Sequence, residues 1–237
     1  MKNGKNTLYE DLKRQILTME LSPDEVLDEV GLSERYGLSR TPVREVFRRL
    51  AGEGYLDIQE NRGARVIAMN YATLRNFFLV APMIYAAVGR LAVHNFRPAQ
   101  LEDLKQTQQR FRQATQARDA LAMVLENNRF HEIMGEMAGN QYLEPSLGRL
   151  LIDHGRIGHT FYRPRDPDME QRLDLSADHH DAFIDAIERR DEEAVVNLVF
   201  EHWELSRANM EMFIAPRGLG SDGQEDLLRS LNSMKKM

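Results

Sequence analysis

Apolar residues recur at helical spacing along most of the chain, and after Asn70 no strand-like alternation remains. The period of 3.6 residues predicts six long helices, over residues 71–95, 98–117, 119–138, 141–162, 168–190 and 192–213. Helices joined by such short links pack as an antiparallel bundle, which can hold a ligand between its helices. From residue 216 the chain is rich in Gly, Ser, Asp and Lys, which predicts a flexible tail.

The segment before Asn70 follows a different pattern, with three shorter helices and then a hairpin. A first amphipathic helix carries its apolar face at Leu8, Leu12, Ile16 and Leu17. The segment 27–38 predicts a second short helix that ends near Gly37. Ser39 can cap a third helix, and Pro42 falls in its first turn, where the missing N–H has no intrahelical partner. A tight turn between the second and third helices is typical of a helix-turn-helix.

The third predicted helix has an apolar face and a cationic face. The apolar face, which would pack against the rest of the domain, consists of Val43, Val46, Phe47 and Leu50. Arg40, Arg44 and Arg48 form an i, i+4 stripe away from it. An isolated arginine stripe is more often a solvated surface than a binding site. The helix-turn-helix context favours DNA binding instead, because the second helix of that motif enters the major groove by its N-terminal end.

A β-hairpin is predicted directly after this helix. Leu56 and Ile58 alternate with polar residues, the segment 61–63 supplies turn residues, and alternation resumes from Arg65 with Val66 directed inward. A hairpin in this position would form the wing of a winged helix, with Arg62 at its tip.

The run LSRTPVREVFRRLAGEGYLDIQENRGARV resembles the winged-helix DNA-binding domain of the GntR family of bacterial transcription regulators, over residues 7–69. The resemblance implies a winged helix-turn-helix domain at residues 1–69 that binds a double-stranded operator. It also implies DNA contacts by Arg35, Ser39, Arg40, Thr41, Arg44, Arg62 and Gly63. These residue types suit the task, because arginine can donate two hydrogen bonds to guanine O6 and N7 whereas hydroxyl groups mainly contact phosphates.

The overall charge alone would not indicate a DNA-binding protein. The chain has 31 Lys and Arg against 37 Asp and Glu, a formal net charge of −6. Between Arg35 and Arg65, however, seven arginines stand against four acidic residues. A small basic region on an acidic protein is typical of site-specific binding with weak nonspecific affinity.

Two absences narrow the chemistry and the location. The chain has no cysteine, so a metal ion could be bound only by histidine, carboxylate or amide groups. No stretch of eighteen apolar residues and no secretory signal is present, which predicts a cytoplasmic protein without membrane contact.

Two further runs, NNRFHEIMGEMAGN and HHDAFIDAIERRDEEAVVNLVFEHW, resemble the all-helical FCD effector-binding domain of the FadR branch of the GntR family, over residues 71–213. The resemblance implies a mainly α protein whose effector-binding and dimerisation domain spans 70–215, before a tail at 216–237. It further implies a divalent metal ion, zinc or nickel, bound by Asn127, His131, His180 and His202. Without the resemblance, a lone helical histidine is more often a core or surface residue. That interpretation is kept for His94, His154, His159 and His179.

The chain departs from the FCD pattern at two places. Asn127 stands where aspartate is usual, and its neutral amide oxygen is a poorer ligand for a divalent cation. A metal ion bound by three imidazoles and an amide would keep its full double charge and favour an anionic effector carboxylate. The segment 81–85 stands where Arg-x-x-Leu-Glu is common, so that Ala81, Met83 and Tyr85 would make the ligand pocket more apolar.

The sequence therefore predicts a ligand-responsive transcription regulator, not an enzyme, that binds a palindromic operator as a homodimer and responds to a small carboxylate. Two alternatives remain. The three histidines of the cluster could bind the ligand directly, without a metal ion. A metal-dependent hydrolase is disfavoured because no general base pairs with the histidines.

Overall fold

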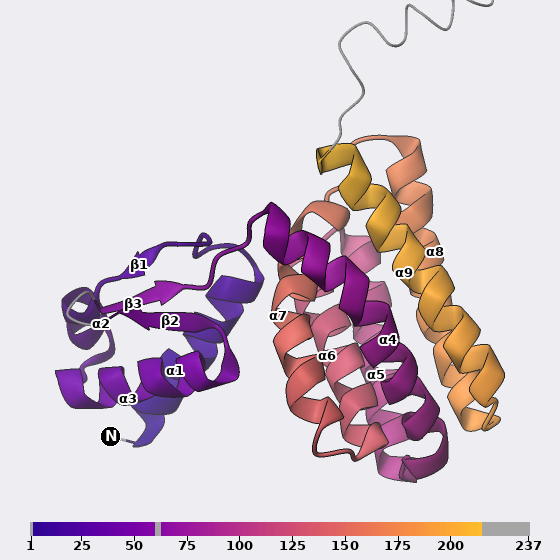
Figure 1. Ribbon diagram of the computed structural model, residues 1–237, viewed down its shortest axis with the longest axis horizontal. Coiled ribbons are helices and arrows are strands. Elements are labelled where there is room, and N and C mark those ends of the chain that lie inside the picture. The colour runs from indigo at the N-terminus through magenta and orange to yellow at the C-terminus, as the bar shows by residue number, and fades with distance from the viewer. Residues whose placement is uncertain (1, 60–62, 215–237) are drawn as a thin grey trace, which may run out of the picture.

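The computed structural model describes the backbone of residues 2–59 and 63–214, which form a small N-terminal head beside a helical bundle (Figure 1). The head contains α1 (Lys2–Leu17), β1 (Val26–Leu27), α2 (Glu29–Tyr36), α3 (Arg40–Glu53), β2 (Leu56–Gln59) and β3 (Gly63–Val66). The bundle contains α4 (Tyr71–Asn95), α5 (Pro98–Ala117), α6 (Ala120–Ala138), α7 (Leu143–Phe161), α8 (Pro167–Glu188) and α9 (Glu192–Ile214). The predicted fold class, a winged helix-turn-helix followed by an all-α bundle, is confirmed.

The head forms around the apolar faces of α1 and α3. All the residues assigned to these faces from the sequence are buried: Leu8, Leu12, Ile16, Leu17, Val43, Val46, Phe47 and Leu50. A three-stranded antiparallel sheet with the order β1-β3-β2 packs on them. Strand β1 was not predicted, because two residues, of which Val26 is exposed, are too few to show alternation.

The helix-turn-helix geometry arises from local capping. The side chain of Asp28 accepts a hydrogen bond from the backbone N–H of Val30 at the start of α2. Gly37 ends α2 at φ +61°, a left-handed conformation that glycine adopts without steric cost. Ser39 has the backbone conformation of an N-cap, but its side chain makes no capping hydrogen bond, so that part of the prediction is wrong.

The hairpin is only partly as predicted. Leu56 and Val66 are buried, but Ile58 is 47% exposed because it lies on the open side of the groove between the hairpin and α3. Gly63 begins β3 at φ +79° and pairs with Gln59 across the strands. Arg62, the predicted tip of the wing, lies outside the described residues, as does the predicted tail from residue 216.

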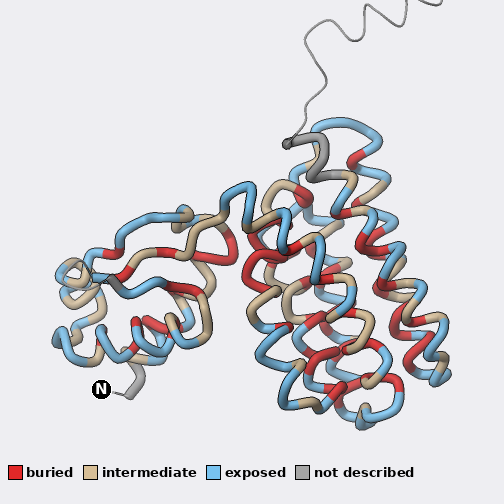
Figure 2. Tube along the Cα trace, viewed as in Figure 1, coloured by how far each residue is buried: buried red, intermediate tan, exposed pale blue. Residues whose placement is uncertain are grey.

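The bundle helices have nearly the predicted bounds, and Figure 2 shows their buried positions along the faces that meet. Helix α4 packs against α6, α7 and α9 and carries buried Phe77, Tyr85 and Val88. By length and composition α4 is also apolar enough to cross a membrane, with a mean hydropathy of 1.6 over its most apolar window. A core helix of a soluble protein passes the same test, and α4 contacts α6, α7 and α9 on one side, although only 39% of the apolar window is buried.

Helix α7 connects the bundle to the head at several points. Gly155 of α7 lies against Leu17 at the end of α1, where an added Cβ would come within 3.0 Å of the Leu17 side chain. Arg149 donates a hydrogen bond to the carbonyl of Gly54, the C-cap of α3. Arg156 donates to the carbonyl of Ile67, which follows the wing, with an N···O distance of 2.5 Å. The head is therefore fixed to α7 through its first helix, its third helix and the linker.

Candidate functional sites

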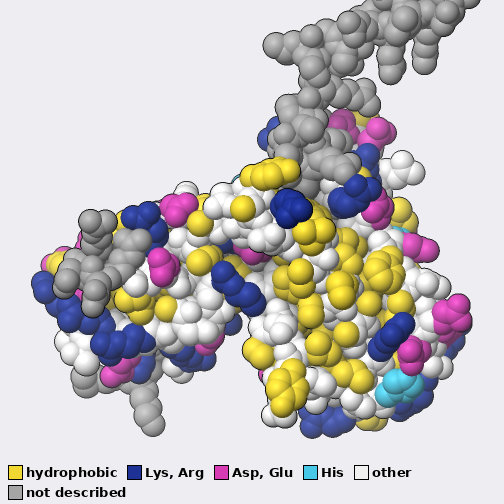
Figure 3. Space-filling model, viewed as in Figure 1, with side chains coloured by type: hydrophobic (Ala, Val, Ile, Leu, Met, Phe, Trp, Pro, Cys, Tyr) yellow, Lys and Arg dark blue, Asp and Glu magenta, His cyan; other side chains and the backbone are white. Residues whose placement is uncertain are grey.

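The first candidate site is the exposed surface of α3 and the hairpin. Arg40, Thr41, Arg44 and Arg48 are exposed, in the order in which the sequence predicted a cationic face. A groove lined by Arg44, Arg48, Ile58 and Gly63 separates this face from the wing, with a volume of about 470 Å³. In Figure 3 several Lys and Arg side chains, in dark blue, are visible on the head, with a few acidic side chains among them.

Arg44 is already paired in the structure. Its Nε donates to a carboxylate oxygen of Glu29 on α2 at 2.9 Å, while the Arg44 side chain stays 56% exposed. This ion pair raises the pKa of Arg44 and holds the guanidinium beside α2. Arg35 lies over the ring of Tyr36, 5.7 Å from its centre, at the end of α2.

The second candidate site is a buried cluster of histidines inside the bundle. His131 of α6, His180 of α8 and His202 of α9 each offer a ring nitrogen, and these nitrogen atoms all lie within 4.8 Å of one another. The three side chains are buried, and Asn127, one turn before His131, is 1% exposed. The structure therefore brings together histidines from three helices, of which the first and last, His131 and His202, are 71 residues apart in the sequence.

The unpaired polar atoms of this cluster point to a missing partner. Both ring nitrogens of His131, Nε2 of His180 and Nδ1 of His202 are buried without a hydrogen bond, as are both amide atoms of Asn127. Buried polar groups without partners are rare because desolvation costs about 1–3 kcal/mol for each. So many in one place indicate a site that binds an ion or a polar ligand.

Burial keeps these imidazoles neutral. It lowers the pKa of His131 and of His202 well below the ordinary value of 6.5, and neighbouring imidazoles lower both further. The same effect lowers the pKa of His180 to about 3 and that of His154 to about 4. At neutral pH the cluster presents nitrogen lone pairs, which are the form that binds a metal ion.

His154 of α7 lies beside this cluster and is, as predicted, a core residue with a hydrogen bond rather than one of the three clustered ligand candidates. Its ring centre lies 4.9 Å from that of His131, and its Nδ1 is 2.7 Å from the hydroxyl of Tyr85. The sequence carries one signal that His154 is buried, because it continues the buried series of Leu147 and Leu151 at helical spacing. His94, in contrast, is exposed and pairs with Glu192 at 2.8 Å.

The three residues predicted to line a pocket on α4 lie in different places. Tyr85 is buried against His131 and His154, and Ala81 is fully buried in the bundle core. Met83 is 70% exposed on the outer face of α4 and does not line the interior, because two residues of a helix separate it from Tyr85 by roughly 200°. Its assignment to the pocket is wrong. A small cavity beside His154 and His202 is lined also by Ser176 and Ser206.

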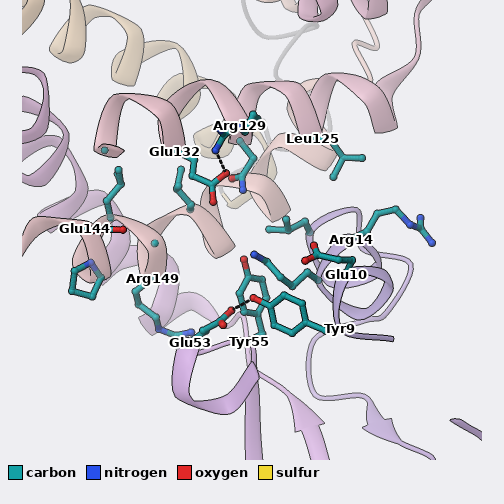
Figure 4. Close-up of a pocket in the computed structure, with 18 of the residues that line it drawn as sticks. Tyr9, Glu10, Arg14, Glu53, Tyr55, Leu125, Arg129, Glu132, Glu144 and Arg149 are labelled. Carbon is teal, nitrogen blue, oxygen red and sulfur yellow. Dashed lines mark hydrogen bonds and ion pairs between the residues drawn. The ribbon is translucent and has the colours of Figure 1, made fainter. Parts of the chain in front are cut away.

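A further cleft lies between the head and the bundle, away from the histidines. Figure 4 shows it between α1, the end of α3, α6 and α7, with a volume of about 650 Å³. Its charged side chains largely satisfy one another: Arg129 contacts Glu132 and Glu136 at 2.8 and 2.6 Å, and Tyr9 donates to Glu53 at 2.5 Å. The cleft separates two bodies and is spanned by the contact from Arg149 to Gly54.

Comparison with known families assigns both parts of the molecule. Residues 5–66 match the gntR family of bacterial regulatory proteins, and residues 83–205, more than half of the chain, match the FCD domain. The chain belongs to the GntR family. It is a DNA-binding transcription regulator with an FCD effector-binding domain.

Known relatives of this GntR regulator resemble it along most of its length. The HTH-type transcriptional repressor RspR of Escherichia coli is 28% identical over 196 residues, which cover 82% of this chain and 83% of the relative. A probable D-xylose utilization operon transcriptional repressor of Paenarthrobacter nicotinovorans is 24% identical and covers 80% and 83%. The solved structure of E. coli McbR/YncC has a TM-score of 0.74 at 20% identity and covers 89% and 98%, which shows the shared fold.

The histidine cluster of the GntR regulator fits a divalent metal ion by its donor set. FCD domains can bind metals, and the three imidazoles supply neutral nitrogen ligands of the kind that zinc and nickel accept. The unpartnered nitrogens of His131, His180 and His202 are the atoms such an ion would engage. The amide oxygen of Asn127 is a further buried atom without a partner on the same helix face.

Proposed function

We propose that this regulator is a FadR-type homodimer that binds a palindromic operator and responds to a small carboxylate bound at a divalent metal ion. The DNA-binding domain spans residues 1–69, the effector-binding and dimerisation domain spans 70–215, and the protein acts in the cytoplasm. The observation that carries the sensory part is the set of unpartnered nitrogens in the buried histidine cluster. The exposed face of α3 supports the DNA-binding part.

Operator recognition is assigned to the N-terminal half of α3 and to the wing. Arg40, Thr41 and Arg44 are exposed on the side of α3 opposite to its buried apolar residues. The hydroxyl of Ser39 makes no capping bond, which leaves it available for a phosphate. The proposed contact to the DNA backbone is made by Arg35. The wing contacts the DNA through Arg62 and Gly63.

Replacing Arg40 or Arg44 by alanine is expected to weaken specific operator binding by about 1–3 kcal/mol for each residue that contacts a base. The loss for Arg44 is expected to be the smaller, because the arginine must first leave Glu29. Fluorescence anisotropy with DNA from the adjacent intergenic region, against a shuffled duplex at the same salt concentration, measures the change. Arg118→Ala, at the end of α5 with its side chain 84% exposed, is the matched control. Wild-type affinity in both α3 variants would remove the recognition helix from its proposed role.

The metal ion is assigned to His131, His180 and His202, with Asn127 as the fourth ligand. Asn127→Asp is expected to tighten Zn²⁺ binding by about tenfold, about 1.4 kcal/mol, because a carboxylate binds a dication better than an amide does. Competition with a chromophoric chelator measures this affinity. Asn128→Asp, one residue along α6, is the control. Less than about a tenth of an equivalent of zinc or nickel in untagged wild-type protein, even after both are offered, would favour the metal-free alternative.

The carboxylate effector follows from the charge of the proposed site. Three neutral imidazoles and an amide leave the metal ion with its double positive charge inside a buried cavity, where an anion is the favoured partner. The cavity beside His202 also presents His154, Ser176 and Ser206, which can hydrogen-bond to a carboxylate, but its volume of about 10 Å³ means that side chains must move before a carboxylate can enter. A thermal-shift screen of small carboxylates with Zn²⁺-loaded protein tests this assignment, and stabilisation by neutral analogues alone would contradict it.

The homodimer is assigned to the outer face of α4. Leu79, Val80 and Met83 are 58, 48 and 70% exposed there, and Figure 3 shows apolar side chains gathered on this side of the bundle. A contiguous exposed apolar surface is typical of a protein interface, and a twofold partner would present the same helix. Met83→Glu is expected to shift the protein toward a monomer in sedimentation velocity, whereas Leu121→Glu, on α6, is expected to leave the dimer intact. Unchanged dimer in the Met83 variant would exclude this face.

A further inference from the structure

A buried glutamine of α5, Gln108, lies behind the histidine cluster. Its side chain is 3% exposed and reaches across to α8 with both of its polar atoms. Nε2 donates to the backbone carbonyl of Ala177 at 2.8 Å, and Oε1 lies 3.1 Å from Nδ1 of His180. The structure therefore holds Gln108 by two hydrogen bonds that are one helical turn apart on α8.

These two bonds decide which nitrogen of His180 carries its proton. The carbonyl of Ala177 can only accept a hydrogen bond, so the NH₂ group of Gln108 must face it and the amide oxygen must face His180. The amide oxygen also only accepts, so Nδ1 of His180 must be the donor. In a neutral imidazole the other nitrogen, Nε2, is then unprotonated. That nitrogen is buried and has no partner.

The ring of His180 is also held in its plane. Phe130 stacks on it with ring centres 4.1 Å apart and an interplanar angle of 6°, and the ring of Phe111 lies 5.0 Å away. Stacking fixes the plane of the imidazole, and the bond to Gln108 fixes its rotation within that plane. Together they fix the orientation of the His180 ring, which contributes one of the three ring nitrogens that lie within 4.8 Å of one another.

We propose that Gln108 is the positioning residue of the metal site, which sets the tautomer of His180 and directs its Nε2 toward the ion. The assignment rests on the proposed metal-binding function. A partner behind a metal-binding histidine is often a carboxylate, which adds negative charge. Here both Gln108 and Asn127 are neutral amides, so neither offsets the charge of the ion. The positive charge that would attract an anionic effector is thereby preserved.

The first measurement concerns the metal-free wild-type protein and needs no variant. Long-range ¹H–¹⁵N correlation NMR of the imidazole rings at pH 7.5 distinguishes the two tautomers. A proton on Nδ1 of His180 is the expected result. A proton on Nε2 would overturn the assignment, whatever the protein does with metal ions.

The second measurement is Zn²⁺ affinity by chelator competition in three variants. Gln108→Leu removes the acceptor and is expected to weaken Zn²⁺ binding by about 10- to 100-fold, the usual effect of losing such a partner. Gln108→Glu keeps the acceptor for His180 and adds a negative charge but, like Gln108→Leu, loses the donor to the Ala177 carbonyl, and it is expected to bind Zn²⁺ more tightly than Gln108→Leu. Gln109→Leu changes the exposed neighbour of Gln108 and is expected to leave the affinity unchanged.

The outcomes separate this inference from the proposed function. Wild-type Zn²⁺ affinity in a folded Gln108→Leu variant would overturn the positioning role. If that variant does not fold, the NMR result decides, because it is measured on the wild-type protein. If the wild type binds no metal ion but carries the proton on Nδ1 of His180, the metal proposal fails while the tautomer assignment stands.

Discussion

The metal-free protein is expected to lose about 5 kcal/mol of stability from its buried histidines when the pH falls from 7.5 to 5.5. His131, His154, His180 and His202 all have a pKa far below 6.5 in the folded state, chiefly because of burial. In the unfolded chain the same groups take up protons near pH 6.5. The unfolded state therefore binds more protons below that pH, and each pH unit lowers the free energy of unfolding by about 1.4 kcal/mol per histidine.

The sign of this pH dependence follows because the folded state keeps the histidines neutral at pH values where the unfolded state protonates them. Above pH 6.5 both states are neutral and the cluster adds no pH dependence. Between 6.5 and about 4, stability falls as the pH falls, and the slope weakens only when the folded protein itself is protonated. Urea unfolding at several pH values, in the presence of chelator, gives the slope.

Two variants sharpen this measurement. His180→Gln removes one titrating group and is expected to reduce the slope by about one proton, whereas His94→Gln alters an exposed histidine outside the cluster and serves as the control. Equal stability of the wild type at pH 7.5 and 5.5 would show that the cluster is not buried as described.

Much of the fold could be predicted from the sequence, because its periodicity is strong and its helix ends are well marked. The helix 71–95 is bounded by Asn70, whose side chain accepts from the N–H of Thr73, and by the Arg97–Pro98 step. Capping residues and prolines of this kind act within one helical turn, so they can be recognised in the sequence without a tertiary structure. Strand β1 escaped prediction because it depends on pairing with β3, at Val26 with Arg65 and Leu27 with Ala64.

The candidate site was less accessible from the sequence. The resemblance supplied His131, His180 and His202, and the structure brings these three together. Gln108 was missed because its role depends on a neighbour 72 residues away, His180. Met83 was misplaced because a pattern of residue types does not tell which face of α4 turns inward. Contacts between distant helices need the packing itself.

Arg156→Ala is expected to destabilise the protein by about 3–5 kcal/mol, the usual cost of leaving a buried charge without its partner. The Arg156 side chain is fully buried, donates to Asp153 at 3.1 Å and also donates to the Ile67 carbonyl. Asp153 is buried as well, which raises the pKa of its carboxyl group, while Arg156 lowers it. Urea unfolding at pH 7.5 measures the loss. Arg163→Ala, an exposed arginine beyond the same helix, is the control and is expected to change stability by less than about 0.5 kcal/mol.

The double variant Asp153→Leu/Arg156→Met separates the ion pair from the linker contact. Apolar side chains in place of both charges leave no buried charge, so most of the stability is expected to return. The bond to Ile67 stays lost, however, while the contacts of Arg149 and Leu17 with the head and α7 remain. A stable protein with a looser head is therefore the expected product. A double variant as unstable as Arg156→Ala would show that the charge pair is not the source of the loss.

Loosening the head is expected to weaken operator binding by on the order of tenfold, about 1.4 kcal/mol, because flexible heads lose more freedom when DNA fixes their spacing. We infer that α7 links sensing to DNA binding. The reason is that His154 contacts the histidine cluster from the same helical turn that carries Asp153 and Arg156. An ion or ligand that displaces His154 would shift the anchor of the linker. Anisotropy titrations with the folded double variant test whether α7 makes this link. Operator affinity equal to that of the wild type would exclude α7 as the connection between the histidine cluster and DNA binding.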